Sequence, residues 1–309
     1  MCTTCGCSDG ADPRVTDLET GVVAPLTTGA QDHSPEHGHS HEHGHAHEHS
    51  HSHQHGHSHE HDPAHEHGHL HEHAHEHTHD HGAPPVKADP TPRTLRLEQE
   101  VLAKNNQLAE RNRGWFEGRR ILALNLTSSP GAGKTTLLER TIRDLGADVP
   151  ISVIEGDQET VRDAERIRAA GSRAVQINTG SGCHLDAEML ARGLKTLDPP
   201  SGSLVMIENV GNLVCPALFD LGEHAKVVIA SVTEGEDKPL KYPHMFRAAE
   251  LLILNKIDLL PHLEFDVGRF LTYARQVNPQ LSILQVSATR GDGLDAWYSW
   301  LRARREMAA

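Results

Sequence analysis

Basic and aromatic side chains are scarce in the first third of this 309-residue chain. Residues 1–90 contain only 2 Lys or Arg against 15 Asp or Glu, and all 11 aromatic residues lie at or after Trp115. Without large apolar side chains to bury, a segment cannot offset the entropy lost on ordering, so we predict no packed core there. Residues 91–309 carry 27 basic and 28 acidic side chains, which excludes the net basic surface of a nucleic-acid-binding domain.

Long apolar runs are also missing, because no stretch approaches the roughly 18 residues that span a bilayer. The chain begins with cysteines instead of the basic and then apolar regions of a signal peptide. We therefore expect a soluble, cytoplasmic protein that does not contact the membrane. Only 5 cysteines are present, three of them at positions 2 to 7, and in a reducing compartment such a cluster more often binds metal than forms disulfides.

Histidine, by contrast, is abundant. Of 27 histidines, 23 lie between His33 and His81, where residues 32–81 approach a dipeptide repeat of His and a small or acidic residue. We predict a disordered arm that binds many divalent ions weakly and stores Ni²⁺, because neutral imidazole is a good nickel ligand. Protonation should lower its capacity as the pH falls towards 5. The alternative is a solvated run with no metal role.

The rest of the chain divides by composition. Residues 1–31 hold the cysteine cluster and a connecting segment, residues 82–94 are proline-rich and predict a linker, and residues 95–309 predict one folded domain that begins with an amphipathic helix ending near Gly114. Short apolar runs in this domain predict buried strands at Ile121 to Leu126, Ile151 to Ile154, Ala174 to Ile177, Leu204 to Ile207, Val227 to Ser231, Leu251 to Leu254 and Ile283 to Val286. Helix-length segments between them include Thr135 to Leu145, Val161 to Ala170 and Asp186 to Leu197. This alternation predicts an α/β fold, doubly wound, with a mostly parallel sheet and helices on both faces.

The first predicted strand runs directly into a glycine-rich loop. The sequence Ser128-Ser129-Pro130-Gly131-Ala132-Gly133-Lys134-Thr135 stands between a strand and a helix, the context that a phosphate-binding loop requires. Backbone N–H groups of Gly131, Ala132, Gly133, Lys134, Thr135 and Thr136 should surround the phosphates, with Lys134 reaching the β- and γ-phosphates and the Thr135 hydroxyl ligating Mg²⁺. The alternative is a strand-to-helix turn that binds nothing.

Two later motifs indicate which nucleotide binds. Asn255-Lys256-Ile257-Asp258 and Ser287-Ala288-Thr289 each end a predicted strand, so both should reach the carboxyl edge of the sheet, where such folds bind ligands. The Asp258 carboxylate can accept from guanine N1–H and the 2-amino group together, donors that adenine lacks. We therefore predict GTP and GDP as ligands. The site would contain Asn255, Lys256, Asp258, Ser287 and Ala288.

Two carboxylates follow further predicted strands at this edge. Asp157 and Glu208 stand where Mg²⁺ ligands are expected, and the Gly211 N–H stands where it would sense the γ-phosphate. The predicted catalytic group is Lys134, Thr135, Asp157 and Glu208. No arginine can be assigned to the transition state, so we predict slow hydrolysis of GTP to GDP and phosphate. A helix-capping or surface carboxylate is the alternative for Glu208.

A second set of side chains predicts a metal site in the same domain. Cys183 and His184 stand at the start of a predicted helix, and Cys215 lies four residues beyond Gly211. Two thiolates and an imidazole suit Zn²⁺ or Ni²⁺ and leave a fourth position open. Because Cys215 and the phosphate sensor share one short segment, we expect metal and nucleotide binding to be coupled. The alternative is that both cysteines are buried as small apolar residues and that His184 begins the helix.

The amino-terminal cysteines predict a separate nickel site. Cys2, Cys5 and Cys7 offer three thiolates, and removal of Met1 would free the Cys2 amine as a fourth donor. A square-planar set of three sulfurs and one nitrogen suits Ni²⁺ better than the tetrahedral preference of Zn²⁺. A reactive, exposed cysteine cluster is the alternative.

Four features together resemble the hydrogenase nickel-incorporation GTPases, the HypB family of the SIMIBI class of P-loop GTPases. They are Met1-Cys2-Thr3-Thr4-Cys5-Gly6-Cys7, the His-rich tract, the loop from Asn125 to Thr136, and Thr233-Glu234-Gly235-Glu236-Asp237-Lys238-Pro239-Leu240-Lys241-Tyr242-Pro243. The resemblance covers about residues 95 to 305 and the first seven. In this family Ser stands in the first phosphate-loop position and Glu in the Mg²⁺ region, as they do here.

The resemblance implies a metallochaperone that hydrolyses GTP while delivering Ni²⁺ to the large subunit of [NiFe]-hydrogenase. It also implies GTP-dependent homodimerisation and a zinc- and nickel-binding partner chaperone of the HypA type. By resemblance, the metal-site roles fall on Cys183, His184 and Cys215, and the high-affinity nickel role on Cys2, Cys5 and Cys7. Three alternatives stay open: a urease-type nickel GTPase, which the cysteine cluster and the Cys183-His184 pair disfavour; a nickel storage protein with a vestigial loop; and a small-molecule phosphotransferase.

Overall fold

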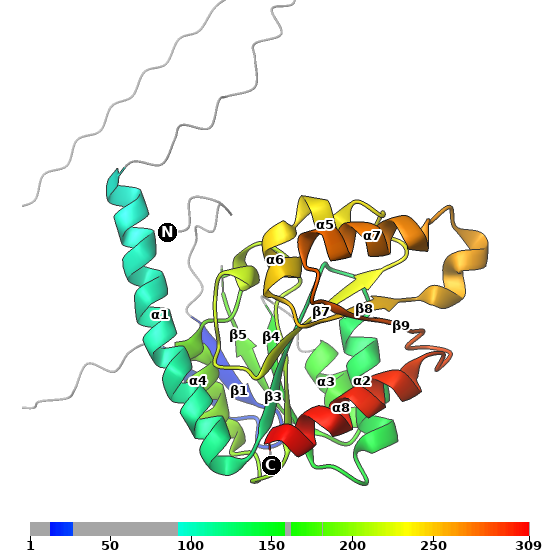
Figure 1. Ribbon diagram of the computed structural model, residues 1–309. Coiled ribbons are helices and arrows are strands. Elements are labelled where there is room, and N and C mark those ends of the chain that lie inside the picture. The colour runs from blue at the N-terminus through cyan, green and yellow to red at the C-terminus, as the bar shows by residue number, and fades with distance from the viewer. Residues whose placement is uncertain (1–12, 27–91, 158–161, 181, 309) are drawn as a thin grey trace, which may run out of the picture. The chain divides into compact units, whose positions relative to one another are not determined.

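The computed structural model describes residues 13–26, 92–157, 162–180 and 182–308 (Figure 1). The strands are β1 (Arg14–Asp17), β2 (Val23–Pro25), β3 (Leu122–Ser128), β4 (Ile151–Asp157), β5 (Arg173–Asn178), β6 (Leu204–Glu208), β7 (Ala225–Ser231), β8 (Leu251–Asn255) and β9 (Ser282–Gln285). The helices are α1 (Pro92–Arg119), α2 (Lys134–Leu145), α3 (Arg162–Ala169), α4 (Ala187–Leu197), α5 (Lys238–Lys241), α6 (Pro243–Ala248), α7 (Val267–Val277) and α8 (Leu294–Ala308), with 3₁₀ helices η1 (Cys215–Ala217) and η2 (Ile257–His262). The predictions for Cys2, Cys5, Cys7, the tract at 32–81 and the linker up to residue 91 concern residues outside the described ranges.

The strands form a single nine-stranded sheet in the order β2-β1-β5-β4-β6-β3-β7-β8-β9. The pairs from β5 to β9 are all parallel, whereas β1 pairs antiparallel with both β2 and β5. From β3 the chain places β4 and β5 on one side, returns to insert β6 between β3 and β4, and then builds β7, β8 and β9 on the other side. The predicted doubly wound, mostly parallel α/β fold is confirmed, and the glycine-rich loop after β3 stands at the switch point where such sheets bind ligands.

Each face of the sheet is covered by its own helices (Figure 1). On one face a large apolar cluster packs the strands against α2, α3 and α8, and includes Leu138, Ile167 and Trp297. The other face carries two separate clusters, one with α1 and α4 and one with α6 and α7. Because Asn125 of β3 lies opposite Lys226 of β7 in the parallel register, these two polar side chains point to that second face.

Helix α1 is longer than the sequence predicted, since it starts within the predicted linker and continues past Gly114 to Arg119. Its first turns expose Leu97 and Val101, and its second half is hydrogen-bonded to the domain. Asn112 donates to the carbonyl oxygens of Ala187 and Leu221 at 2.9 and 3.0 Å. A β-carbon at Gly222 would lie 2.3 Å from a backbone oxygen of α1. No helix of the described residues is long and apolar enough to cross a membrane.

Strands β1 and β2 were not predicted, because residues 1–31 were interpreted as a metal motif and a connecting segment. Strand β1 adds to the edge of the sheet with Arg14 opposite Asn178 of β5. The two strands have 4 and 3 residues, and only Val15 is buried. Such short strands carry too little alternation to be recognised in a sequence.

A candidate nucleotide and metal site

A cavity of about 500 Å³ opens at the carboxyl edge of the sheet, over the loop that follows β3. The phosphate-loop residues 130–136 line it together with Asp157 at the end of β4, Glu208 at the end of β6, and Gly211. The edge where parallel strands end is where α/β sheets bind ligands. Most of the residues predicted for the phosphates and Mg²⁺ therefore share one cavity.

The glycine loop has the backbone conformation that a phosphate-binding loop needs. Gly131 and Gly133 have φ of 75° and 94°, which side chains disfavour. A β-carbon at Gly133 would also lie 2.5 Å from the Asn255 amide nitrogen. Asn255 donates to the Ala132 carbonyl at 2.9 Å and accepts from the Ala288 N–H at 3.1 Å. One buried amide thus joins the phosphate loop to both predicted guanine motifs.

The guanine-motif side chains contact one another at the same edge. Ser287 Oγ donates to Asp258 Oδ1 at 2.6 Å, which orients the carboxylate. The Lys256 ammonium donates to the Gly131 carbonyl at 2.6 Å, and Lys256 itself has a left-handed φ of 64°. Lys256 thus joins the phosphate loop to the segment that carries Asp258, although Asp258 itself does not line the cavity.

Glu208 is the centre of the polar contacts in the cavity. Its Oε1 accepts from the Thr135 hydroxyl at 2.7 Å and lies 3.3 Å from the Lys134 ammonium. Its Oε2 has no hydrogen-bond partner among the described residues, although the side chain is buried. Hydroxyl and carboxylate oxygens are the ligands that Mg²⁺ prefers, and the unpartnered buried oxygen fits a cation.

Glu155 is a cavity residue that the sequence reasoning missed. It lies inside β4, is 3 % exposed, and lines the cavity between Asp157 and Glu208. Burial, and then the charges of Glu208 and Asp157, raise its pKa to about 9. Its only signal in the sequence is its place in Glu155-Gly156-Asp157, two residues before the aspartate predicted to ligate Mg²⁺.

Arg166 of α3 is the second residue that was missed. No arginine can be assigned to the transition state from the sequence, yet Arg166 lines the cavity. Its guanidinium pairs with Glu139 of α2 at 3.0 Å and with Asp163 at 3.0 Å. It also donates to the Thr136 hydroxyl at 3.4 Å. Arg166 therefore joins α2 to α3 at the margin of the cavity.

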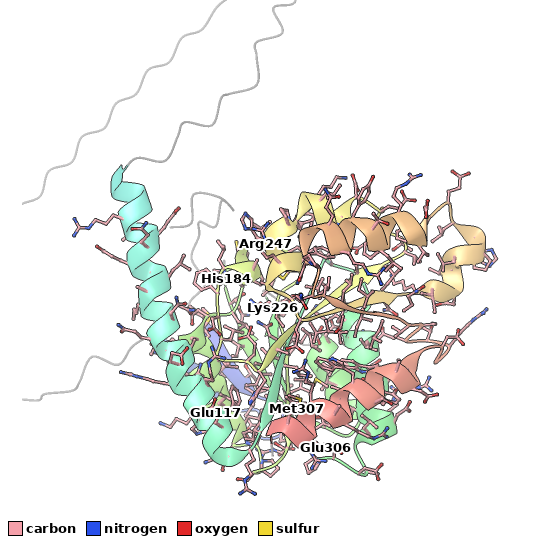
Figure 2. The ribbon with its side chains drawn as sticks, in the orientation of Figure 1. Glu117, His184, Lys226, Arg247, Glu306 and Met307 are labelled. Atoms are coloured by element: carbon pink, nitrogen blue, oxygen red, sulfur yellow. The ribbon has the colours of Figure 1, made fainter. Side chains whose placement is uncertain are left out.

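Cys183, His184 and Cys215 form the second half of the site. One donor atom from each lies within 4.8 Å of the other two, and Cys183 Sγ is 3.7 Å from His184 Nδ1. His184, labelled in Figure 2, packs its ring on Phe219 with centroids 4.0 Å apart. Burial lowers the pKa of His184, which favours the neutral imidazole that metal binding requires. Two sulfurs and one nitrogen suit Ni²⁺ or Zn²⁺.

The segment after β6 connects the two halves directly. It leaves the cavity at Glu208 and reaches Cys215 in η1. On the way, the Asn209 carboxamide oxygen accepts from the Leu185 N–H at 3.2 Å, and the Asn212 amide donates to the Cys183 carbonyl at 3.3 Å. These two hydrogen bonds attach the segment to the loop that carries Cys183 and His184.

A nucleotide-binding family model confirms what the cavity indicates. The model described as "CobW/HypB/UreG, nucleotide-binding domain" matches residues 122–285. The chain is also 60 % identical over 213 residues to hydrogenase maturation factor HypB of Escherichia coli K12, covering 69 % of this chain and 73 % of the relative. The chain belongs to the HypB family.

Two solved HypB structures resemble the fold. HypB from Archaeoglobus fulgidus is 41 % identical with a TM-score of 0.62, and the match covers 66 % of this chain and 99 % of that one. HypB from Helicobacter pylori, solved in complex with nickel, is 37 % identical with a TM-score of 0.62, covering 66 % and 96 %. The chain therefore shares the P-loop GTPase domain of the HypB hydrogenase maturation factors.

Proposed function

We propose that this HypB protein is a GTP-hydrolysing nickel metallochaperone in which the nucleotide controls the Cys183, His184 and Cys215 site. The observation that supports this most is the segment from Glu208 to Cys215, which has a cavity carboxylate at one end and a metal donor at the other. The segment contains Cys215, and Asn209 and Asn212 connect it by hydrogen bonds to the loop that carries Cys183. Loss of the terminal phosphate would then loosen the bound metal.

The chain's own residues divide the work on the nucleotide. Gly131, Ala132, Gly133, Lys134, Thr135 and Thr136 bind the phosphates, and Asp258 reads guanine with support from Ser287. Thr135, Glu208 and Asp157 would hold Mg²⁺, directly or through water, and when bound Mg²⁺ neutralises charge on the transferred phosphoryl group. Binding requires Lys134 to exchange Glu208 for phosphate oxygens. Turnover is expected to be slow, because Arg166 is paired with two carboxylates.

Nickel is the proposed cargo. Thiolate and imidazole donors bind Ni²⁺ and Zn²⁺ well, and the Helicobacter pylori relative was solved with nickel. Cys2, Cys5 and Cys7 are proposed as the high-affinity nickel donors, and the histidines from His33 to His81 as the weak reservoir. We propose the [NiFe]-hydrogenase large-subunit precursor as the recipient, a HypA-type chaperone as a partner, and a GTP-dependent homodimer as the active form.

The coupling is tested by measuring nickel affinity in two nucleotide states. Replacing Cys2, Cys5 and Cys7 by Ser leaves Cys183 and Cys215 as the only thiols of the full chain. The thiolate-to-Ni²⁺ charge-transfer absorption then reports this site alone, because nickel bound by histidines gives no such absorption. Half-saturation with GDP and with a non-hydrolysable GTP analogue should differ by about fivefold or more. Equal affinities would remove the coupling and with it the proposed function.

A second experiment separates this function from nickel storage. Hydrogenase maturation at limiting nickel should be lost in Lys134→Ala and kept in Lys104→Ala, which changes an exposed lysine of α1. Deletion of residues 32–81 should only lower the response at scarce nickel. Maturation that survives Lys134→Ala but not the deletion would make storage the function.

A further inference from the structure

A cluster of three buried polar side chains divides the apolar packing on one face of the sheet. The cluster under α1 and α4 and the cluster under α6 and α7 are separate, and Asn125, Glu223 and Lys226 lie between them. All three are at most 8 % exposed. Charged groups are rarely buried unless they are paired and hydrogen-bonded. Neither the nucleotide chemistry nor the donor set of the metal site accounts for them.

One end of this group reaches the nucleotide cavity. The Asn125 carboxamide oxygen accepts from the Asn209 amide at 3.2 Å, and Asn209 follows Glu208 directly. The same Asn209 side chain accepts the Leu185 N–H beside the Cys183 loop. Asn209 also donates its backbone N–H to the Leu126 carbonyl of β3 at 3.0 Å, so its position depends on the strand that leads into the phosphate loop.

The other end reaches the Cys215 loop. The Asn125 amide donates to Glu223 Oε1 at 3.0 Å, and the Lys226 ammonium lies 3.6 Å from that oxygen. Lys226 donates to the carbonyl oxygens of Pro216 and Phe219 at 2.8 and 3.2 Å. Pro216 follows Cys215, and the Phe219 ring packs on His184. His184 and Lys226 are labelled in Figure 2.

We propose that Asn209, Asn125, Glu223 and Lys226 form a positioning network that transmits the nucleotide state to the metal site. The inference rests on the proposed function, because it names the residues through which the coupling there acts. Both metal-bearing loops are attached to the network, Cys183 and His184 through Leu185, and Cys215 through Pro216 and Phe219. Lys226 is the positioning residue for the second attachment.

The reason the network can transmit a change is that its buried polar groups are mutually satisfied. Glu223 Oε2 accepts the Leu221 N–H at 2.7 Å while Oε1 accepts from Asn125, so both oxygens are engaged. If Asn209 moved and Asn125 did not, buried donors and acceptors would lose their hydrogen bonds, which costs free energy. The favoured response is a concerted shift of the group, and the loop carbonyls held by Lys226 shift with it.

The test uses the full chain in the Cys2, Cys5 and Cys7→Ser background, with Ni²⁺ as the probe. Lys226→Met removes the ammonium but keeps the side-chain length, and Asn125→Ala cuts the link between Asn209 and Glu223. The matched control is Tyr298→Phe, which removes a 2.7 Å hydrogen bond to Asp144 outside the network. The measured quantity is the ratio of nickel half-saturation with GDP to that with a GTP analogue.

We expect the parent and Tyr298→Phe to share one ratio, and both network variants to move towards a ratio of 1. The affinity for a fluorescent guanine nucleotide should change by less than about threefold, because Lys226 and Glu223 do not line the nucleotide cavity. Network variants that keep the parent ratio would overturn the inference while the proposed function stands. A parent ratio of 1 would instead overturn the proposed function, and the inference would fall with it.

Lys226→Met leaves a buried carboxylate without its cation, so a second variant guards against misfolding. The double variant Glu223→Gln/Lys226→Met removes both charges at nearly constant volume. Circular dichroism and the melting temperature establish that it folds. It should also lose the nucleotide-dependent ratio, and a ratio equal to that of the parent would count against the network.

Discussion

The nucleotide cavity and the metal site differ in how their side chains are held. In the cavity the functional groups bind one another, with Lys134 and Thr135 on Glu208 and Lys256 on the Gly131 carbonyl. In the metal site the three donors point to a common centre and are supported by neighbours such as Phe219. A nucleotide must displace the contact between Lys134 and Glu208 to bind, whereas a metal meets three donor atoms that already lie within 4.8 Å of one another. In the proposed coupling, the cavity is the half that rearranges and the metal site is the half that responds.

The largest expected effect breaks base recognition in the cavity. Asp258→Ala should weaken GDP binding by about a hundredfold or more, because guanine N1–H and its 2-amino group lose their acceptor. Competition between GDP and ADP measures the lost preference. Asp295→Ala, which changes an exposed carboxylate of α8, should leave the preference unchanged. An Asp258→Ala protein that still prefers GDP would place guanine recognition elsewhere.

The next effect breaks the metal half alone. Cys215→Ser should lower nickel affinity at the Cys183 site by about tenfold to a hundredfold, because a soft thiolate is replaced by a hydroxyl. The charge-transfer titration with Ni²⁺ measures it, and guanine nucleotide affinity should stay within about twofold. His262→Ala, outside the cluster, is the control. Unchanged nickel affinity would mean that Cys215 is a packing residue.

A third prediction sharpens the account of the phosphate loop. Gly133→Ala should destabilise the protein by about 1–3 kcal/mol and abolish tight nucleotide binding, since φ is 94° and the added β-carbon would meet Asn255 at 2.5 Å. Gly202→Ala has a similar φ of 73° with open space around it, so it isolates the backbone strain. Urea unfolding of both variants gives the comparison. Equal losses would show that the contact with Asn255 adds nothing.

The last prediction concerns pH, and its effect is the smallest when it is counted per pH unit. Glu155 has a pKa of about 9 in the folded protein against an ordinary value of 4.5. Between these values the folded protein keeps a proton that the unfolded chain has released, so stability falls as the pH rises, by up to about 1.4 kcal/mol per unit.

Glu155→Gln carries no ionisable group there, so its advantage over the parent should grow from pH 6 to pH 8. The measurement is urea unfolding in EDTA without nucleotide. The exposed Glu264→Gln should show no such trend. Parallel stability curves for the parent and Glu155→Gln would contradict the buried, protonated carboxyl.

The fold and the contiguous motifs of the cavity could be predicted from the sequence. Buried parallel strands appear as short apolar runs, and all seven predicted runs are strands in the sheet. The phosphate loop is contiguous, so its geometry follows from local residue types such as Gly131 and Gly133. Helix α1 was predicted from its spacing, but its start was placed too late because residues 92–94 belong to a proline-rich segment that favours a linker.

The rest depends on contacts between distant segments. Asn125 and Lys226 meet only because β3 and β7 are neighbours in register, and neither shows in the sequence that it lies in a buried polar group. Arg166 reaches the cavity only because α3 packs beside α2. Glu155 is hidden inside an apolar strand. Such positions become visible only when the strand order is known.

Helix α1 also contacts the segments that follow both metal-bearing loops, so its position depends on the distance between them. Asn112 bonds Ala187 and Leu221 together, and these residues follow the Cys183 loop and the Cys215 loop respectively. Helix α1 has 28 residues, and at about 1.5 Å per residue it is roughly 42 Å long. In the proposed coupling, a wider spacing between those loops would tilt α1 about Asn112, with the largest displacement at its far end near Pro92.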